Sequence, residues 1–333
     1  MSTTFRLPKF IHIFYATGMK WPNHMGFFKG ECGIWAKDLE LPKGGDTILY
    51  PGCYEMEFVY MPTHLKNAYE LWSEDKPIDE FLNEFKARLA VEYPKVEESR
   101  VKMFGEPLKA TVYILKKLGY EFGFLYEDDV LTGAHFSLLG LDKPLEKQAR
   151  DACEIFKRYN IKKLITTNPA STYAALNIFP KYMDGYNIDV VHYLDLYEKR
   201  LDKLPKASVK EPVVIHDCHF WGRTLRELKI DEKLRIVLEH IGAEPVEPKY
   251  TRNHVHCCGA PASLADPQTS SLMALYRLNE LIEAARASNS KVIITACPSC
   301  FNALYAALKK YGPKDIEMMD ISLYIVKRVF GGV

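Results

Sequence analysis

The sequence lacks the features that would place the protein in a membrane or mark it for export. No uncharged apolar run approaches the about 18 residues that a spanning helix needs. The apolar stretch at residues 10–14 is too short for the core of a signal peptide. The net charge of only +1 provides no basic surface for nucleic acid. We therefore expect a cytoplasmic protein whose thiols stay reduced, with peripheral association at the inner face of the membrane left open.

The bulk composition is that of an ordinary globular protein. Hydrophobic residues make up 47% of the 333 residues and charged residues 26%, and this length allows two domains with separate cores. A Pro- and Lys-containing stretch at 200–212 is typical of an interdomain linker. We expect an N-terminal extension at 1–46, a first domain at 47–205 and a second domain at 206–333.

An internal repeat organises the chain. Three segments of the first half align in the same order with three of the second: 47–53 with 212–218, 131–138 with 257–264, and 163–171 with 292–300. Three matches in one order indicate duplication. The first half carries an additional insertion, in which apolar spacing predicts a helix over Ile78–Val91.

The expected elements give an α/β fold with short parallel strands and flanking helices in each half. The predicted strands are Thr47–Leu49, Lys163–Thr166, Val213–His216 and Lys291–Thr295. The predicted helices after the repeat positions are Leu225–His240, Ser271–Ala287 and Phe301–Tyr311. A further apolar spacing at 321–330 predicts a short helix that docks on the core, with membrane contact as the alternative.

Five cysteines of the second half form the most specific pattern in the sequence: Cys218, Cys257, Cys258, Cys297 and Cys300. Their arrangement is Cys-x38-Cys-Cys-Gly-x37-Cys-Pro-x-Cys. In a chain without export signals, such cysteines are metal or cluster ligands more readily than disulfide partners. A zinc site, buried cysteines without a ligand and a redox disulfide are the alternatives, although adjacent cysteines suit one tetrahedral ion poorly.

This pattern resembles the cysteine-rich CCG domain, which occurs, usually twice per chain, in the B-type component of heterodisulfide reductase and in related components of other oxidoreductases. The resemblance covers roughly residues 47–330 and implies two tandem, pseudo-duplicated CCG domains. It also implies that the five cysteines hold one noncubane [4Fe–4S] cluster, so that the same five residues are the metal ligands and the cofactor-binding residues. The fifth ligand and the adjacent pair then have a reason, because such a cluster has more iron contacts than a cubane.

The first half departs from the family pattern. Cys53, Leu131, Thr132, Asn168 and Ser171 stand at its five cysteine positions. One thiolate does not hold a cluster, so we expect none in this half. Cys53 is either a functional thiol that faces the cluster, and therefore a candidate catalytic residue, or a relic packed in a loop.

Several further residues are candidates around these loops. Histidines crowd them, at His135, His216, His219, His254 and His256. Those next to a predicted ligand, His219 and His256, are the preferred candidates for tuning the cluster or relaying a proton. Cys153 is expected in the core, whereas Cys32 lies in a segment that resembles the linker to a ferredoxin-like portion in fused family members.

The resemblance implies an oxidoreductase subunit that acts on sulfur groups, passing electrons to or from a thiol, disulfide or sulfane-sulfur substrate at the cluster. The implied partners are homologues of two further components of heterodisulfide reductase: the ferredoxin-like C-type component, which would dock near residues 1–46, and the flavoprotein, its A-type component. A lipoate-binding protein is a further candidate. The alternative is a non-catalytic electron-transfer or anchoring subunit of a flavin dehydrogenase for succinate, glycolate or glycerol 3-phosphate.

Overall fold

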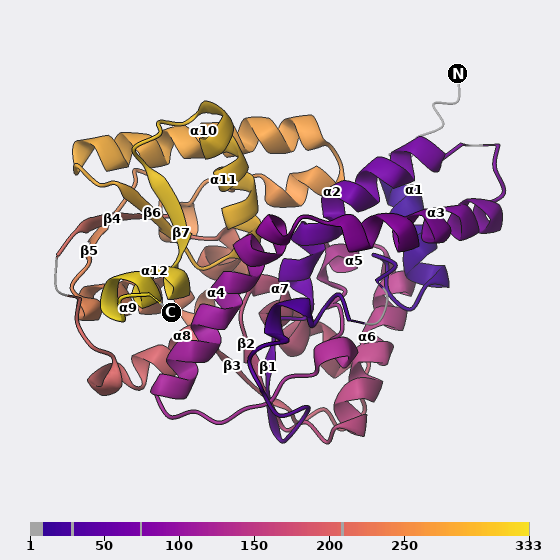
Figure 1. Ribbon diagram of the computed structural model, residues 1–333, viewed down its shortest axis with the longest axis horizontal. Helices are drawn as coiled ribbons and strands as arrows, with labels where there is room; N and C mark the ends of the chain where they lie inside the picture. The colour runs from indigo at the N-terminus through magenta and orange to yellow at the C-terminus, as the bar shows by residue number, and fades with distance from the viewer. Residues whose placement is uncertain (1–8, 28–29, 74, 208–209, 333) are drawn as a thin grey trace.

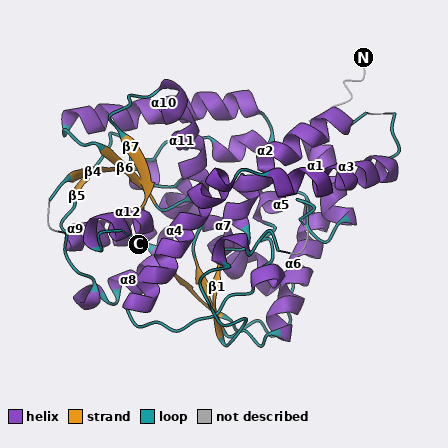
Figure 2. Ribbon diagram, viewed as in Figure 1, coloured by secondary structure: helices purple, strands orange, loops and turns teal. Residues whose placement is uncertain are grey.

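The computed structural model describes residues 9–27, 30–73, 75–207 and 210–332. Each half of the chain is built on a parallel sheet covered by helices, as Figures 1 and 2 show. The first sheet has the order β1-β2-β3, with β1 Thr47–Tyr50, β2 Lys163–Thr166 and β3 Asp189–His192. The second has the order β5-β4-β6-β7, with β4 Pro212–Ile215, β5 Glu244–Val246, β6 Val292–Thr295 and β7 Glu317–Asp320. The predicted α/β class is confirmed.

The two sheets repeat one plan, since β1, β2 and β3 correspond in order and neighbours to β4, β6 and β7. The outer edges of the two sheets also correspond. Gly123 pairs with Ile48 beside β1, where β5 pairs with β4 in the second sheet. A Cβ atom on Gly123 would lie 1.9 Å from the carbonyl oxygen of Gly44, so only glycine fits this edge.

Helices begin at the carboxyl ends of corresponding strands. After β2 and β6 come α7 Pro169–Tyr173 and α11 Pro298–Tyr311, and after β3 and β7 come α8 Tyr193–Glu198 and α12 Ile321–Val329. The cap residues are Asn168 for α7 and Cys297 for α11. These strand ends therefore carry the repeat positions that the sequence analysis identified.

The remaining helices surround the sheets. In the first half these are α1 Lys9–Lys20, α2 Tyr54–Leu71, α3 Ile78–Glu92, α4 Glu98–Lys117, α5 Ala134–Leu139 and α6 Asp142–Arg158, and in the second they are α9 Ile230–Ile241 and α10 Pro267–Ala287. The predicted helices at 78–91, 271–287, 301–311 and 321–330 correspond to α3, α10, α11 and α12. The N-terminal segment belongs to the first half, because α1 packs on α6 and α3 and Trp35 is buried against Phe124. Residues 1–8 of the expected extension lie outside the described residues.

The predicted helix over 225–240 begins later than expected. A π-helical turn at Phe220–Thr224 and a 3₁₀ turn at Arg226–Leu228 come first, and α9 starts only at Ile230. Lys229 has a φ of 52°, which no α-helix continues through. Before Lys229, the backbone at Gly222 lies close to the backbone at Arg252. A Cβ atom on Gly222 would lie 2.3 Å from the carbonyl oxygen of Arg252.

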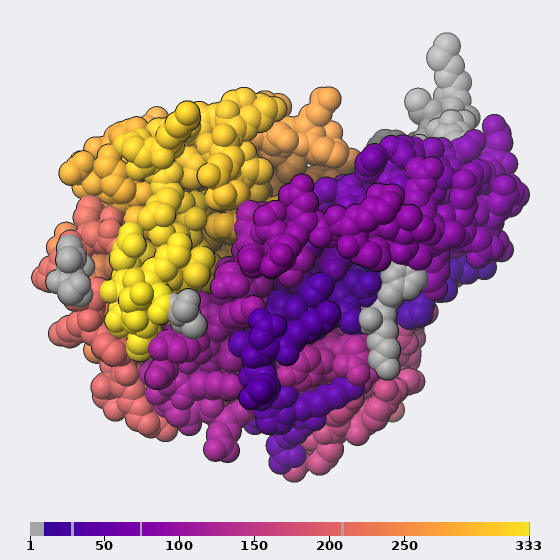
Figure 3. Space-filling view, viewed as in Figure 1, coloured from indigo at the N-terminus to yellow at the C-terminus, as the bar shows by residue number. Residues whose placement is uncertain are grey.

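The two halves meet over a broad face, which Figure 3 shows as the boundary between the purple and the yellow-orange parts. Helix α8 packs on α9, and α12 packs on α4, so the corresponding helices α8 and α12 each pack on the opposite half. The hydroxyl of Ser322 at the start of α12 accepts a hydrogen bond from the Thr111 hydroxyl at 2.9 Å. Helix α12 is thus a core-docking helix. Among the described residues, no helix combines the length and apolarity needed to cross a bilayer.

Candidate metal centre

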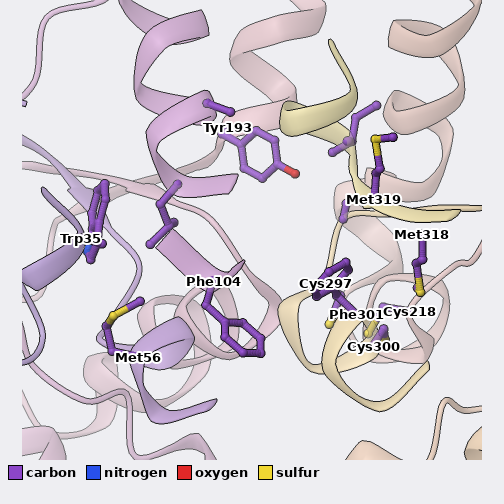
Figure 4. Close-up of a cluster of buried hydrophobic side chains, with 14 of the residues drawn as sticks. Trp35, Met56, Phe104, Tyr193, Cys218, Cys297, Cys300, Phe301, Met318 and Met319 are labelled. Atoms are coloured by element: carbon purple, nitrogen blue, oxygen red, sulfur yellow. The ribbon is translucent and has the colours of Figure 1, made fainter. Parts of the chain in front are cut away.

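Three chain segments bring the five predicted ligands together at the carboxyl edge of the second sheet. Cys218 follows β4, Cys297 follows β6, and Cys300 lies in the first turn of α11. The sulfur atoms of these three residues lie within 4.8 Å of one another, and all three side chains are buried. Figure 4 shows them gathered at one side of the core.

The adjacent pair completes the group from a third loop. Cys258 is buried, and its sulfur lies within 4.8 Å of the sulfur of Cys300 and a ring nitrogen of His216. Cys257 is half-buried, and its sulfur accepts a hydrogen bond from the backbone N–H of Gly259 at 3.4 Å. Gly259 turns the loop at a φ of +85°, where a Cβ would lie 2.4 Å from the Ser270 carbonyl oxygen. The backbone here therefore requires the glycine of the Cys-Cys-Gly sequence.

The electrostatics of the site favour a thiolate at the start of α11. Burial alone would raise the pKa of Cys297. However, the neighbouring thiols of Cys218 and Cys300 and the backbone N–H groups of Cys300 and Ser299 donate to its sulfur, and together they hold the pKa well below the ordinary value. A helix N-terminus with free N–H groups stabilises an anionic sulfur in this way.

A buried ion pair fixes the loop of Cys218 to the loop that leads to Cys257. The guanidinium of Arg235 donates to both carboxylate oxygens of Asp217, at 2.9 and 2.8 Å. The same carboxylate accepts hydrogen bonds from the Thr251 hydroxyl and the Arg252 backbone N–H, each at 2.7 Å. Two ligand-bearing loops thereby keep one relative position.

His216 is a site residue that the sequence analysis named but did not prefer. It is fully buried, and Arg277 Nε–H donates to its Nδ1 at 3.1 Å, while Arg277 in turn pairs with Glu280 at 2.7 Å. Burial, followed by the charge of Arg277, lowers the pKa of His216 to about 3. Its neutral ring thus carries the proton on Nε2, which has no hydrogen-bond partner among the described residues. The sequence feature that could have identified His216 is its position two residues before Cys218.

The two preferred histidines lie in different surroundings. His219 lines a cavity beside the cysteines, with Nδ1 3.4 Å from the sulfur of Cys257. His256 instead lies 2.6 Å from the carboxylate of Glu280 and packs against the Tyr250 ring at a tilt, outside that cavity. His254 is exposed.

The cavity lies between the two halves and has a volume of about 380 Å³. Four of the cysteines form part of its wall in the second half: Cys218, Cys258, Cys297 and Cys300. The opposite wall is largely apolar and comes from α1, α2, α5 and α7, together with Arg100 of α4. Tyr54 joins the two walls, because its hydroxyl lies 2.7 Å from the hydroxyl of Ser299. Tyr54 was missed by the sequence analysis, although it follows Cys53 as His219 follows Cys218.

The corresponding positions of the first half are occupied by a hydrogen-bonded network. The amide of Asn168 donates to the Pro51 carbonyl oxygen at 2.9 Å and to Glu55 at 3.1 Å, and its oxygen accepts from the Ser171 backbone N–H at 2.8 Å. Leu131 is buried in the core. The side chains at these positions are fully engaged with the protein itself.

Cys53 does not present a free thiol in this structure, because it forms a disulfide with Cys32. Both residues are buried, and the backbone N–H of Cys53 donates to Asp129 at 2.8 Å. The prediction that the thiols stay reduced is therefore wrong for these two residues, which are 21 positions apart in the sequence. Any thiol role of Cys53 therefore includes opening this bond. Cys153 is buried in the core, as expected.

The donor set of the second half fits an iron–sulfur cluster. Five cysteines from three loops converge, four of them buried, and cysteine thiolates are the ligands that hold such a cluster. A single tetrahedral zinc ion binds four ligands, so one of the five cysteines would remain without a metal. A ring nitrogen of His216 also lies within 4.8 Å of the sulfurs of Cys258 and Cys300.

The match to a protein-family model covers the same cysteines. Residues 213–305, which include all five cysteines, match the model of the cysteine-rich domain CCG. The second half of the chain therefore carries a CCG domain.

Similar curated proteins are oxidoreductases or their components. The chain is 25% identical over 253 residues to the EtfAB:quinone oxidoreductase of Syntrophomonas wolfei, covering 72% of this chain and 34% of that protein. It is 24% identical to the probable iron–sulfur-binding oxidoreductase FadF of Bacillus subtilis, covering 66% and 31%. It is 26% identical to the D-type component of the dihydromethanophenazine:CoB–CoM heterodisulfide reductase of Methanosarcina acetivorans, covering 66% and 54%. The chain thus spans about a third to a half of the length of these relatives.

Proposed function

We propose that this chain, whose residues 213–305 form a CCG domain, is an iron–sulfur subunit of a heterodisulfide-reductase-like complex. It would transfer electrons to or from a thiol, disulfide or sulfane-sulfur substrate. The observation that carries this proposal is the cavity between the halves, in which four cluster cysteines face an apolar wall large enough to cover a small organic substrate.

The cofactor in this proposal is one noncubane [4Fe–4S] cluster. Its ligands are Cys218, Cys257, Cys258, Cys297 and Cys300. Such a cluster, when bound, supplies one electron at a time to or from a sulfur group beside it. The hydrogen-bonded network around Asn168 in the first half supports one cluster rather than two.

The residues of the chain itself would exclude water and handle protons. Reduction of a disulfide consumes two electrons and two protons and yields two thiols, and oxidation of two thiols releases the same number of each. His219 and the Tyr54 hydroxyl line the cavity from opposite walls, and each can carry a proton. We assign the proton transfer to these two, and His256, held by Glu280, to positioning the loop of Cys257. Cys53 would take part only after reduction of its bond to Cys32.

The electrons would come from or go to partner proteins. We propose a ferredoxin-like protein and a flavoprotein as partners, in keeping with the heterodisulfide reductase and the EtfAB:quinone oxidoreductase among the relatives. A lipoate-binding protein is a further proposed partner, because a dithiolane is a disulfide that this cavity has room for. The proposed location is the cytoplasm, with peripheral association at the inner face of the membrane left open.

A second candidate function is an electron relay without sulfur chemistry, in a flavin-linked dehydrogenase. It is favoured by the relative named as an EtfAB:quinone oxidoreductase, which aligns with 72% of this chain. In that function the cavity would bind no sulfur substrate.

Substrate-dependent spectroscopy separates the two functions. The anaerobically purified protein is reduced with a low-potential viologen and then mixed with lipoamide or with a small mixed disulfide. Sulfur chemistry predicts reoxidation of the cluster, seen in its visible absorption, and one new thiol per electron consumed. No reoxidation by any disulfide, together with rapid reoxidation by an electron-transferring flavoprotein, would contradict the proposed function and support the relay.

A further inference from the structure

A second group of metal-binding side chains lies in the first half, apart from the cysteines. His24 comes from the turn after α1, Glu57 from α2 and His135 from α5. Their ligand atoms all lie within 4.8 Å of one another, and all three side chains are buried. The repeat did not copy this group, since Gly222 and Pro261 stand in the second half at the positions of Glu57 and His135.

The distances within the group match a coordination shell. Nε2 of His24 lies 3.5 Å from one carboxylate oxygen of Glu57, and Nδ1 of His135 lies 3.1 Å from the other. Two ligands held about 2.0 to 2.1 Å from a tetrahedral ion are about 3.3 Å apart. These spacings therefore fit around one cation.

Three polar atoms of the group lack hydrogen-bond partners among the described residues. Both ring nitrogens of His24 and one oxygen of Glu57 are buried without a hydrogen bond to any described residue. The contact of 3.1 Å between His135 and Glu57 is close, but it does not have hydrogen-bond alignment. Buried polar atoms are nearly always satisfied in folded proteins, and each one left alone costs about 1–3 kcal/mol. A bound cation would satisfy this group.

The surroundings hold the rings in place and leave one side accessible. His24 packs edge-on against Phe14 and Phe136, with ring centroids 4.5 and 5.1 Å apart. His135 packs against Tyr54 at 5.3 Å and lines the cavity that the cluster cysteines also line. His135 therefore places the group beside that cavity.

We propose that His24, Glu57 and His135 bind a divalent transition-metal ion through two imidazoles and one carboxylate. Zn²⁺ and Fe²⁺ are the ions that this ligand set holds in proteins, with further positions open to water or substrate. The ion lies on the wall of the cavity opposite the cysteines. It gives the first half, which kept only one of five cysteine positions, a metal centre of different chemistry.

The test is metal binding by the full-length, cluster-containing protein. After removal of loosely held metal with a chelator, wild-type protein is titrated with Zn²⁺ and its metal content is measured by mass spectrometry. One Zn²⁺ per chain beyond the cluster iron is expected, and X-ray absorption should show a shell of nitrogen and oxygen ligands. Wild-type protein that binds no Zn²⁺, or binds it through sulfur, would overturn the proposal.

Two buried carboxylates of α2 provide matched variants. Glu57→Gln should weaken Zn²⁺ binding more than about tenfold, because it removes a ligand. Glu55→Gln is the control, since the Glu55 carboxylate is bound by Thr167 and Asn168 and does not belong to the group. Unchanged cluster iron and circular dichroism verify folding, and His24→Asn replaces Glu57→Gln if that variant does not fold. Equal affinity in the ligand variants and the control would contradict the site.

Discussion

Tyr54 and His219 occupy the same position in the two halves of the chain, and both side chains line the cavity between the halves. Each directly follows the first cysteine position of its half, Cys53 or Cys218. The hydroxyl of Tyr54 reaches Ser299, and the ring of His219 reaches the sulfur of Cys257. The duplication therefore placed on each wall one of the two side chains to which we assign proton transfer, although only one wall kept its cysteines.

His219→Gln should slow disulfide reduction without loss of the cluster. An acid–base residue contributes about a hundredfold or more to a rate, so we expect a loss of that order in viologen-linked reduction of lipoamide. The iron content should stay at the wild-type value, because His219 is not among the five thiolates. His240→Gln is the control, since that ring contacts the Leu204 carbonyl oxygen, remote from the cavity. Equal rates for both variants would remove His219 from the proposed chemistry.

Arg235→Met should destabilise the second half more than any surface change. The substitution leaves the Asp217 carboxylate buried without its partner, and breaking a buried pair in this way costs about 3–5 kcal/mol. Urea unfolding followed by circular dichroism measures the loss. Lys291→Met breaks an exposed pair with Asp315 and should leave the unfolding midpoint nearly unchanged. Similar midpoints for the two variants would show that the Asp217 pair does not hold the ligand loops.

Asp320→Asn should change how stability depends on pH. Burial raises the pKa of Asp320 to about 7 in the folded protein, well above the value of 3.8 for a free side chain. The folded state therefore binds more protons than the unfolded state between those values, and stability falls as the pH rises from about 4 to about 7. Each such group contributes a slope of up to about 1.4 kcal/mol per pH unit.

The variant should lose the Asp320 contribution and keep that of Glu55, whose pKa burial also raises to about 7. Asparagine still accepts the hydrogen bond from the Ser322 backbone N–H that caps α12, so the helix is kept. Urea unfolding at several pH values between 4 and 8 gives the two slopes. Identical slopes for wild type and variant would show that Asp320 is not protonated in the folded protein.

The bond between Cys32 and Cys53 should be found by mass spectrometry. Alkylation of the unfolded, unreduced protein should leave these two cysteines unmodified and joined in one cross-linked peptide pair. Reduction should lower the free energy of unfolding by about 2–4 kcal/mol, because the bond closes a loop in the unfolded chain. Full alkylation of both residues in protein purified without reductant would contradict the pairing.

The sequence predicted the parts of the structure that depend on local pattern and on the repeat. The strands β1, β2, β4 and β6 were predicted because apolar runs there end at repeat positions. Strands β3 and β7 were not, since Asp189–His192 and Glu317–Asp320 each begin with an acidic residue and gain their conformation from pairing with β2 and β6. Their existence follows from the sheets rather than from their own residues.

The candidate site, like the fold, was predictable from the sequence only in part. The five cysteines were recognisable from their spacing, because that spacing is tied to the strand ends. The contact of Tyr54 with Ser299 joins residues 245 positions apart, and the group of His24, Glu57 and His135 joins three separate elements. No local pattern encodes such contacts, so they became visible only in the fold.

The iron and acid-labile sulfide content per chain decides whether one cluster is present, measured on protein purified without oxygen and treated with a mild chelator to remove any mononuclear ion. One cluster held by the cysteines of the second half predicts about four irons and about four sulfides. The same values are expected for Cys53→Ser, and values near zero for Cys297→Ser. About eight irons in the wild type, or wild-type iron in Cys297→Ser, would contradict the account.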